Sequence, residues 1–246
     1  MPHAAAPHLT AADRVIGALA FAAGSADVFA FVRFHDVFTS AMTGNTALLG
    51  LALGRGHLVA ASRSLAALSG FSVGAAGATL IVDSGARLGE ATRMTRVLRR
   101  LLGAEFGLLL LVALSWTLAP MPVHHTLLYA LIITASMAMG VQSVAARLID
   151  VPGIPTVVFT TTLTMIMMAL TRMIRQRGAR NPRTAPVSGL LTLRQIGAMG
   201  LYFGGAAMTG VANFARPPIA VWLAVAAVVV AYHAARGVRD QTSKPR

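Results

Sequence analysis

The order of apolar and polar positions divides the chain into six long apolar segments, separated by polar and often basic connections. Each segment holds roughly 20 residues with little or no charge, the length that a helix needs to cross a hydrocarbon core of about 30 Å. The pattern therefore predicts an all-α, polytopic transmembrane helix bundle. Its six spanning helices are expected at residues 15–32, 64–82, 101–119, 126–146, 190–212 and 217–235.

The composition points to the lipid bilayer as the surroundings of this chain. Hydrophobic residues make up 56% of it and charged residues only 12%, and the mean hydropathy is +0.68. The net charge of +13 would indicate nucleic-acid binding in a soluble protein. Here the basic residues lie between the apolar segments, so no nucleic-acid partner is expected. Because there is no cysteine, disulfides and thiolate metal sites are excluded, and no metal or cofactor is predicted.

The basic residues also predict the orientation, since short cytoplasmic loops of membrane proteins collect Lys and Arg. With both termini in the cytoplasm, the 21 basic residues all lie on the cytoplasmic side except Arg33, Arg55, Arg63 and Arg216. One basic loop is expected to face the cytoplasmic surface, where it can contact anionic lipid headgroups. Its arginines are Arg172, Arg175, Arg177, Arg180 and Arg183.

One motif occurs twice along the chain. The sequence VFTSAMTGNTALLGLAL at residues 37–53 returns in weaker form, VFTTTLTMIMMAL, at residues 158–170. Two further matches keep the same order: residues 71–76 with 202–207, and Gly24 with Gly140. Three matches in one order indicate a duplicated unit. We expect a single transmembrane domain, 1–246, with a first repeat at 15–119, a second at 126–235, and flexible termini at 1–13 and 236–246.

The two motif segments are expected to enter the bundle without crossing it. Residues 39–54 would extend only about 24 Å as a helix, which is short of the hydrocarbon core. Counting both segments as spans would also move the basic loop to the outside, against the charge rule. Each half then has three crossings, an odd number, so the two repeats are inverted. Inverted repeats with short half-helices are typical of channels and secondary transporters.

The hydroxyl groups of the motifs are the candidate lining of a polar cavity. On a helix, Thr39, Thr43 and Thr46 would form one stripe, while Gly44 and Asn45 would break or cap that helix and expose backbone amides to a solute. Small and hydroxyl residues are equally typical of plain packing between membrane helices. The candidate solute-binding residues are Asp27, Thr39, Thr43, Gly44, Asn45, Thr46, Gln142, Thr160 and Thr164.

Asp27 is the acid placed well inside a predicted span. A carboxylate there is costly and faces the bundle interior by default, which indicates proton or cation coupling. The alternatives are that it is protonated, or that it caps the motif helix. Glu105 lies one turn into the third predicted helix, where an interfacial ion pair with Arg99 or Arg100 is expected. Gln142 lies near the repeat equivalent of Asp27 and is expected to complete the polar interior.

The motif residues also carry a family resemblance. The sequences GSAD at 24–27, VFTSAMTGNT at 37–46 and AMGVQ at 138–142 closely resemble the YoaK family of bacterial multi-pass membrane proteins, a family of unknown function. The resemblance implies a location in the cytoplasmic (inner) membrane and transfers no substrate. The second motif departs from the family's first motif because Met165 and Ile166 stand where the first has Gly44 and Asn45.

Two functions from different classes follow. The leading hypothesis is a transporter or channel for a small solute or ion, bound between the inverted halves. The alternative is a non-transporting membrane scaffold or sensor that uses its Arg-rich cytoplasmic loop. An enzyme is not expected, because no pair of nucleophile and base and no metal cluster can be assembled at depth.

Overall fold

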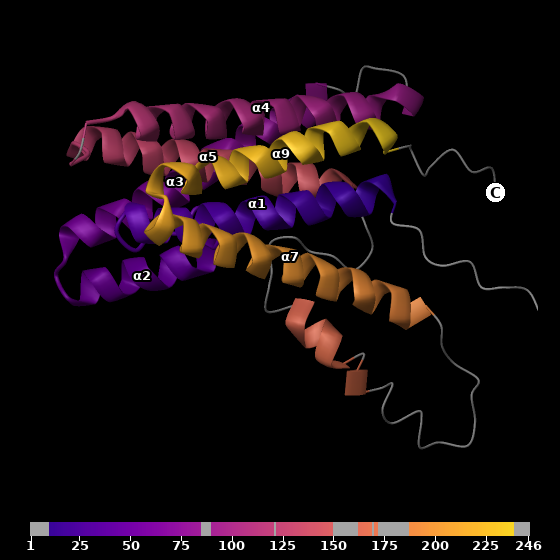
Figure 1. The fold of residues 1–246 in the computed structure, drawn as a ribbon, viewed down its shortest axis with the longest axis horizontal. Coiled ribbons are helices and arrows are strands. Elements are labelled where there is room, and N and C mark those ends of the chain that lie inside the picture. The colour runs from indigo at the N-terminus through magenta and orange to yellow at the C-terminus, as the bar shows by residue number, and fades with distance from the viewer. Residues whose placement is uncertain are drawn as a thin grey trace, which may run out of the picture.

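The computed structural model describes residues 10–84, 90–120, 122–149, 162–168, 170–171 and 187–238. Within these ranges the chain forms helices and no strand (Figure 1), which confirms the all-α class. Residues 162–168 are also helical. The remaining elements are α1 (Ala11–Arg33), α2 (Met42–Gly54), α3 (Leu58–Ser84), α4 (Glu90–Leu118), α5 (His125–Ile149), α7 (Val187–Ala215), α8 (Pro217–Ala220), α9 (Trp222–Ala234) and the 3-10 turn η2 (Ala235–Gly237).

Five helical segments are long and apolar enough to cross a membrane, and they match five of the six predicted windows. They are α1, α3, residues Met94–Leu118 of α4, α5, and Pro217–Gly237, which joins α8, α9 and η2. The sixth window falls on α7. At 29 residues α7 is about 44 Å long, but glycines and polar side chains such as Arg194 and Gln195 dilute its apolar character. It is therefore not one of the five.

Local signals set the start of α1 and tie it to α7. Thr10 caps the helix: its side chain accepts a hydrogen bond from the Asp13 backbone N–H at 3.1 Å, and the Asp13 carboxylate accepts from the Thr10 N–H at 2.9 Å. This reciprocal pair is the capping box that serine or threonine and an acid form at helix N-termini. Asp13 also pairs with Arg194 of α7 at 3.0 Å.

Glycines bring two pairs of parallel helices into close contact. In α1 and α7, a Cβ at Gly24 would overlap the Tyr202 carbonyl oxygen, and a Cβ at Gly205 would overlap the Phe21 carbonyl oxygen. In α3 and α5, Gly74 fits against the Met137 backbone in the same way, and Gly140 against the Phe71 backbone. Small residues at such crossings let helix backbones approach closely, which is how membrane helices gain packing energy. Other close pairs are α1 with α9, α4 with α5, α2 with α3 and α4 with α9.

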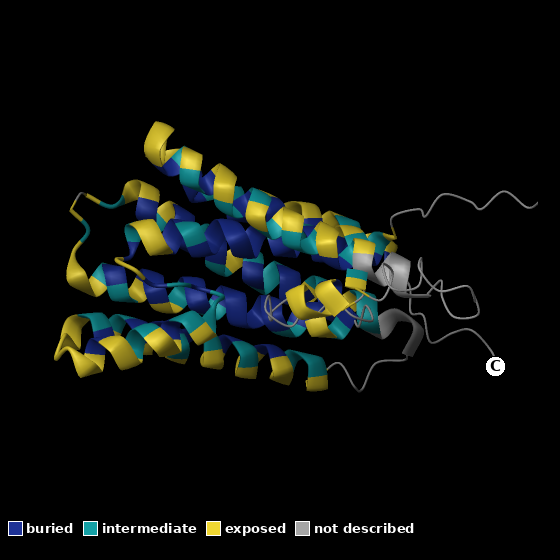
Figure 2. Ribbon diagram, turned by 90° about the horizontal axis from the view of Figure 1, so that it is seen from below, coloured by how far each residue is buried: buried dark blue, intermediate teal, exposed yellow. Residues whose placement is uncertain are grey.

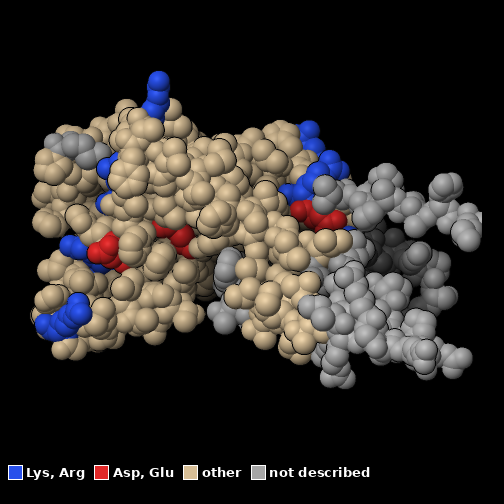
Figure 3. All heavy atoms as spheres, turned by 60° about the horizontal axis from the view of Figure 1, so that its bottom comes forward, with Lys and Arg blue, Asp and Glu red and all other residues tan. Residues whose placement is uncertain are grey.

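The core of the bundle consists of two apolar clusters stacked along its length. α1 and α5 are the most buried of the long apolar helices, and α3 is the least (Figure 2). One cluster includes Phe29, Trp116 and Val221, and the other includes Ile16, Leu101 and Ala231. The outer faces of the helices carry large apolar side chains such as Leu65, Leu80, Leu111 and Phe203. An apolar outer surface of this extent is suited to lipid. On the face shown in Figure 3, Lys and Arg lie toward the two ends of the molecule.

The first motif segment returns to the end of the bundle from which it enters. After α1 ends at Arg33, the chain turns back so that Thr39 and Ser40 contact Asp27, about two helical turns inside that end. α2 then leads outward again and packs against α3 (Figure 1). With 13 residues, α2 extends only about 20 Å, too short to cross a bilayer. We call residues 34–54, which turn back into this end of the bundle and then lead out of it, the re-entrant segment.

The second motif is described only in part. Residues 162–168 are helical, with Thr162 and Ile166 buried, and Gln195 of α7 contacts the Met165 sulfur at 3.8 Å. Thr160 and the basic loop from Arg172 to Arg183 lie outside the described residues.

Candidate functional site

The most concentrated polar cluster in the described part of the chain is built around Asp27. The side chain of Asp27 is only 1% exposed. Its Oδ1 accepts hydrogen bonds from the Thr39 N–H at 2.8 Å, the Thr39 hydroxyl at 3.1 Å and the Ser40 N–H at 2.6 Å. Its Oδ2 accepts from the Ser40 hydroxyl at 2.6 Å and the Tyr202 hydroxyl at 2.7 Å. A carboxylate has roughly four lone-pair directions, so these five donors occupy all of them.

The sequence left open that Asp27 caps the motif helix, and the structure shows a modified form of this alternative. Asp27 caps the motif segment, but through Thr39 and Ser40, which precede α2, and not through residues of the helix itself. The donors come from the backbone and side chains of Thr39 and Ser40 and from the Tyr202 hydroxyl. Within the described residues Asp27 forms no ion pair.

The segment that reaches Asp27 is shaped by a sharp turn and a side-chain clamp. His35 and Asp36 both have positive φ, 59° and 64°, which reverses the chain after α1. Asn45 is fully buried and holds Phe38 at both backbone groups: its Oδ1 accepts from the Phe38 N–H at 3.0 Å, and its Nδ2 donates to the Phe38 carbonyl at 2.7 Å. A Cβ at Gly44 would come within 3.0 Å of the Phe38 ring. Gly44 and Asn45 together therefore determine the shape of the re-entrant segment.

Besides the Asp13–Arg194 ion pair, three polar contacts join α1 to α7. Tyr202 contacts Asp27 as described, the hydroxyls of Ser25 and Thr209 lie 2.6 Å apart, and the Arg33 guanidinium donates to the Asn213 side chain at 2.9 Å. Ser25 and Thr209 are both fully buried. The Asp27 cluster thus connects the re-entrant segment of the first half to a helix of the second half.

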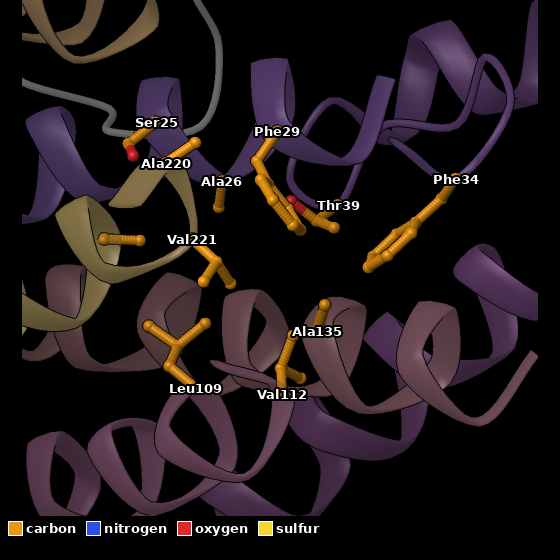
Figure 4. Close-up of a pocket in the computed structure, with 11 residues that line it drawn as sticks. Ser25, Ala26, Phe29, Phe34, Thr39, Leu109, Val112, Ala135, Ala220 and Val221 are labelled. Atoms are coloured by element: carbon orange, nitrogen blue, oxygen red, sulfur yellow. The ribbon is translucent and has the colours of Figure 1, made fainter. Parts of the chain in front are cut away.

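A small cavity lies beside this cluster, at the interface of the two halves (Figure 4). Its volume is about 20 Å³, which is room for roughly one water molecule. Ser25 and Thr39 are its polar lining, and the rest of the wall is apolar. That wall is formed by Ala26, Phe29, Phe34, Leu109, Val112, Ala135, Ala220, Val221 and Ala224.

The structure separates the predicted site residues into interior and exterior groups. Asp27, Thr39 and Asn45 are buried and lie together, as expected. Gln142 is buried on α5 and donates to the Leu19 carbonyl of α1 at 2.8 Å. Its predicted place in the polar interior agrees with this position, although it is not part of the Asp27 cluster.

Thr43 and Thr46 do not line the interior, so the expected stripe is wrong. Both are exposed on α2, and Thr46 returns a hydrogen bond to the Met42 carbonyl at 2.9 Å. Thr39 precedes α2 and is not on the helix at all. Gly44 and Asn45 also do not break the helix, because α2 starts at Met42 and contains both. Thr164 is exposed on the second motif helix.

Two contributors to the cluster were not among the predicted site residues. Ser40 supplies two of the five donors to Asp27, and Tyr202 supplies the one from the second half. A signal for Tyr202 exists, because it matches Phe71 in the repeat and adds a hydroxyl at that place. Within the described residues, no group of acidic, His or Cys side chains is arranged to hold a metal ion.

Comparisons with known proteins place the chain in a family. The family described as "Protein of unknown function (DUF1275)" matches residues 15–234. The UPF0700 transmembrane protein YoaK of Bacillus subtilis (strain 168) is 37% identical over 156 residues, which is 63% of this chain and 65% of that protein. The chain thus covers less than two thirds of the length of this curated relative. No solved structure matches the chain.

These matches confirm the resemblance to YoaK that the motif residues indicated. A family match over nearly the whole bundle, a relative named as a transmembrane protein and five long apolar helices agree with one another. The chain therefore belongs to the DUF1275 family and is a multi-pass membrane protein.

Proposed function

We propose that the protein is a transporter or channel for a small solute, whose path runs between two inverted three-helix halves. The observation that carries the proposal is the Asp27 cluster. A buried carboxylate binds the re-entrant segment of the first half and Tyr202 of the second half, beside a cavity at their interface. Intramembrane carboxylates and non-helical backbone at depth are typical of solute pathways, because lipid satisfies neither.

Matched contacts support the inverted repeat. The sequence pairs Gly24 with Gly140 and the 71–76 segment with 202–207. The Gly24 contact with the Tyr202 carbonyl is then the counterpart of the Gly140 contact with the Phe71 carbonyl. The Gly205 and Gly74 contacts correspond in the same way. At the level of helices, α1 with α7 corresponds to α5 with α3, and α1 with α9 corresponds to α5 with α4.

The positions of the chain ends support six crossings, with α7 as the sixth. A Cβ at Gly237 would approach the Ala11 side chain to 3.0 Å, and Thr95 donates to the Val238 carbonyl, so both described ends lie at one end of the bundle. α7 runs beside α1 from the Asp13 contact to the Arg33 contact. An even number of crossings is required to return the chain to its starting side.

The role proposed for Asp27 is to hold the path closed. All its lone pairs are used by protein donors, so it offers none to a solute in this state. The adjacent cavity holds about one water, which corresponds to a closed conformation. Opening the path requires α1 and α7 to separate or the re-entrant segment to move, and both motions break hydrogen bonds to Asp27.

Cysteine labelling tests the proposed topology, because the protein has no native cysteine. We expect His35→Cys and His57→Cys to react with a membrane-impermeant maleimide from the same, outer side of intact cells. Both residues are exposed and flank the re-entrant segment. Arg236→Cys, at the other end, should react only after permeabilisation. Labelling of His35→Cys and His57→Cys from opposite sides would show that the motif crosses the membrane and would refute the inverted arrangement.

Blocking the cavity tests transport. Ala135 is 4% exposed and lines the cavity, so Ala135→Leu is expected to fill it and to reduce solute flux to the level of empty liposomes. The measurement is osmotic swelling of proteoliposomes with glycerol, urea, acetate or ammonium. Ala76→Leu, an exposed position on α3, is the matched control and should leave flux unchanged. Equal flux through wild type and Ala135→Leu for every permeant solute would show that the path lies elsewhere.

The scaffold or sensor alternative is favoured by one observation, the dense packing around Asp27 and Asn45. Asp27 is 1% exposed and Asn45 is fully buried, and neither residue lines the small cavity described above. This alternative predicts that no solute in the panel crosses the wild-type proteoliposomes faster than empty ones. It also predicts that vesicle binding depends on anionic lipid through the loop from Arg172 to Arg183.

A further inference from the structure

Glu105, in the middle of α4, is a second buried acid with an environment opposite to that of Asp27. It is fully buried, and neither carboxyl oxygen has a hydrogen-bond partner among the described residues. The ion pair expected with Arg99 or Arg100 is absent from the described contacts, because Glu105 points into the bundle while Arg99 donates to Tyr232 of α9 at 2.8 Å. The position of Glu105 in the sequence, close to a basic loop, therefore predicted the wrong contact.

Helical spacing places Glu105 next to the cavity. Leu109 and Val112 line the cavity from α4, and Glu105 lies four and seven residues before them, on the same face of the helix. It therefore lies one turn deeper than the cavity wall. Around it the bundle changes from one apolar cluster to the other, since Leu109 belongs to the first cluster and Leu101 to the second.

α5 presents a matching polar group at this change of cluster. Ala135 lines the cavity, and Gln142 lies seven residues further along the same face of α5. The Gln142 side chain donates to the Leu19 carbonyl, but its Oε1 has no partner within the described structure. Glu105 and Gln142 thus both lie where one apolar cluster gives way to the other, on the side of the cavity opposite the end where the re-entrant segment enters.

A carboxylate without donors in such an interior is very costly, because the free energy of desolvation is not returned by any partner. The same group is tolerated as a neutral acid. Asp27 differs because five donors of the protein surround it. The two acids therefore have different roles: Asp27 is fully occupied by hydrogen bonds, whereas both oxygens of Glu105 are without a partner among the described residues.

We propose that Glu105 is the proton-binding group of the solute path, neutral while the path is closed and exchanging its proton with water when the cavity opens. This inference rests on the proposed transport function and names the coupling ion, a proton. The O–H bond of the acid breaks when water enters, and the proton leaves with that water.

The titratable groups on the helices packed against α4 do not lie in the middle of these helices, where Glu105 lies on α4. They lie near helix ends, and Tyr232 is already bound to Arg99. They are His125, Tyr129 and Arg147 on α5, Tyr232 and His233 on α9, Arg63 and Asp83 on α3, and Arg236 on η2.

Infrared difference spectroscopy of the purified protein tests the site without a known solute. We expect a protonated-carboxyl C=O band at neutral pH that is missing in Glu105→Gln and present in Asp27→Asn. Glu105→Asp keeps an acid and should shift the band, which guards against loss through misfolding. A wild type without the band, or a band that Glu105→Gln leaves unchanged, overturns the inference.

Proteoliposome flux separates this inference from the proposed function. In wild type, an imposed pH gradient is expected to drive solute movement, and Glu105→Gln should lose that response. If wild type moves a solute but neither the gradient nor Glu105→Gln changes the flux, the proton role is wrong and transport stands. If the carboxyl band is assigned to Glu105 but no solute moves, transport is wrong and the buried acid stands.

Discussion

Replacing Asp27 by alanine is expected to lower the free energy of unfolding by on the order of 4 kcal/mol, because each buried polar group left without a partner costs about 1–3 kcal/mol. Five donors lose their acceptor, and two of them are the backbone N–H groups of Thr39 and Ser40, which cannot rotate away. The measurement is SDS titration of the detergent-solubilised protein, following helical circular dichroism. The same change should free the re-entrant segment and raise the reactivity of a cysteine at Ala41.

Two smaller changes at the same cluster are the controls for Asp27→Ala. Tyr202→Phe removes one donor and should cost about 1.5–3 kcal/mol, the range for a hydrogen bond to a charged group. Ser40→Ala removes one hydroxyl donor and keeps the backbone contact, so a similar loss is expected. The order of effects matters: an Asp27→Ala protein no less stable than Tyr202→Phe would mean that the carboxylate does not hold the segment in place.

Replacing Gly205 by alanine is expected to destabilise the bundle by about 3 kcal/mol, the upper part of the range for overpacking a tight core. The added Cβ would overlap the backbone carbonyl of Phe21, which cannot move out of the way as a flexible side chain could. α1 and α7 must therefore separate. The same separation pulls Tyr202 away from Asp27, so the stability loss should be accompanied by altered solute flux in proteoliposomes.

The adjacent glycine provides a matched control. Gly204 is on the same helix, and a Cβ there would meet no described atom within 4 Å. Gly204→Ala should therefore be neutral or stabilise the helix by about 0.5–1 kcal/mol, the usual gain of alanine over glycine in a helix. In α3, Gly74→Ala and Gly77→Ala should repeat this contrast, since Gly74 contacts the Met137 backbone and Gly77 contacts nothing within 4 Å in the described structure. Equal stabilities within each pair would contradict the close helix contacts.

Some of the site could be predicted from residue types alone. Asp27 stood out because an acid inside an apolar window is expensive wherever it faces. Asn45 and Thr39 were noticed as part of a repeated polar motif, and both are buried. Thr39 donates to Asp27, and Asn45 binds the backbone of Phe38, the residue before Thr39. Length alone predicted a short helix in the first motif, and α2 has 13 residues. These features depend on the free-energy cost of burying a polar group and on the length of a segment. Neither changes with the rotation of a helix.

Other assignments failed because they depended on helix rotation. Thr43 and Thr46 were placed on an interior stripe, but the Asn45 clamp on Phe38 fixes α2 so that this face is exposed. Glu105 was paired with the neighbouring arginines because they are close in sequence, whereas the helix buries Glu105 and Arg99 donates to Tyr232 instead. In an apolar segment every face looks similar in sequence, so the pattern contains little information about direction.

The sequence by itself determined the class of protein, the positions of the helices, the short motif segment and the family resemblance, because hydropathy and length act locally and a bilayer enforces both. Only the tertiary structure decided which groups meet. Tyr202 lies 175 positions after Asp27, and their contact depends on the close approach of α1 and α7 at Gly24 and Gly205. That approach fixes the rotation of both helices, and the rotation decides that Asp27 is fully hydrogen-bonded. In the same way, the packing of α4 against its neighbours decides that Glu105 is buried without a partner among the described residues.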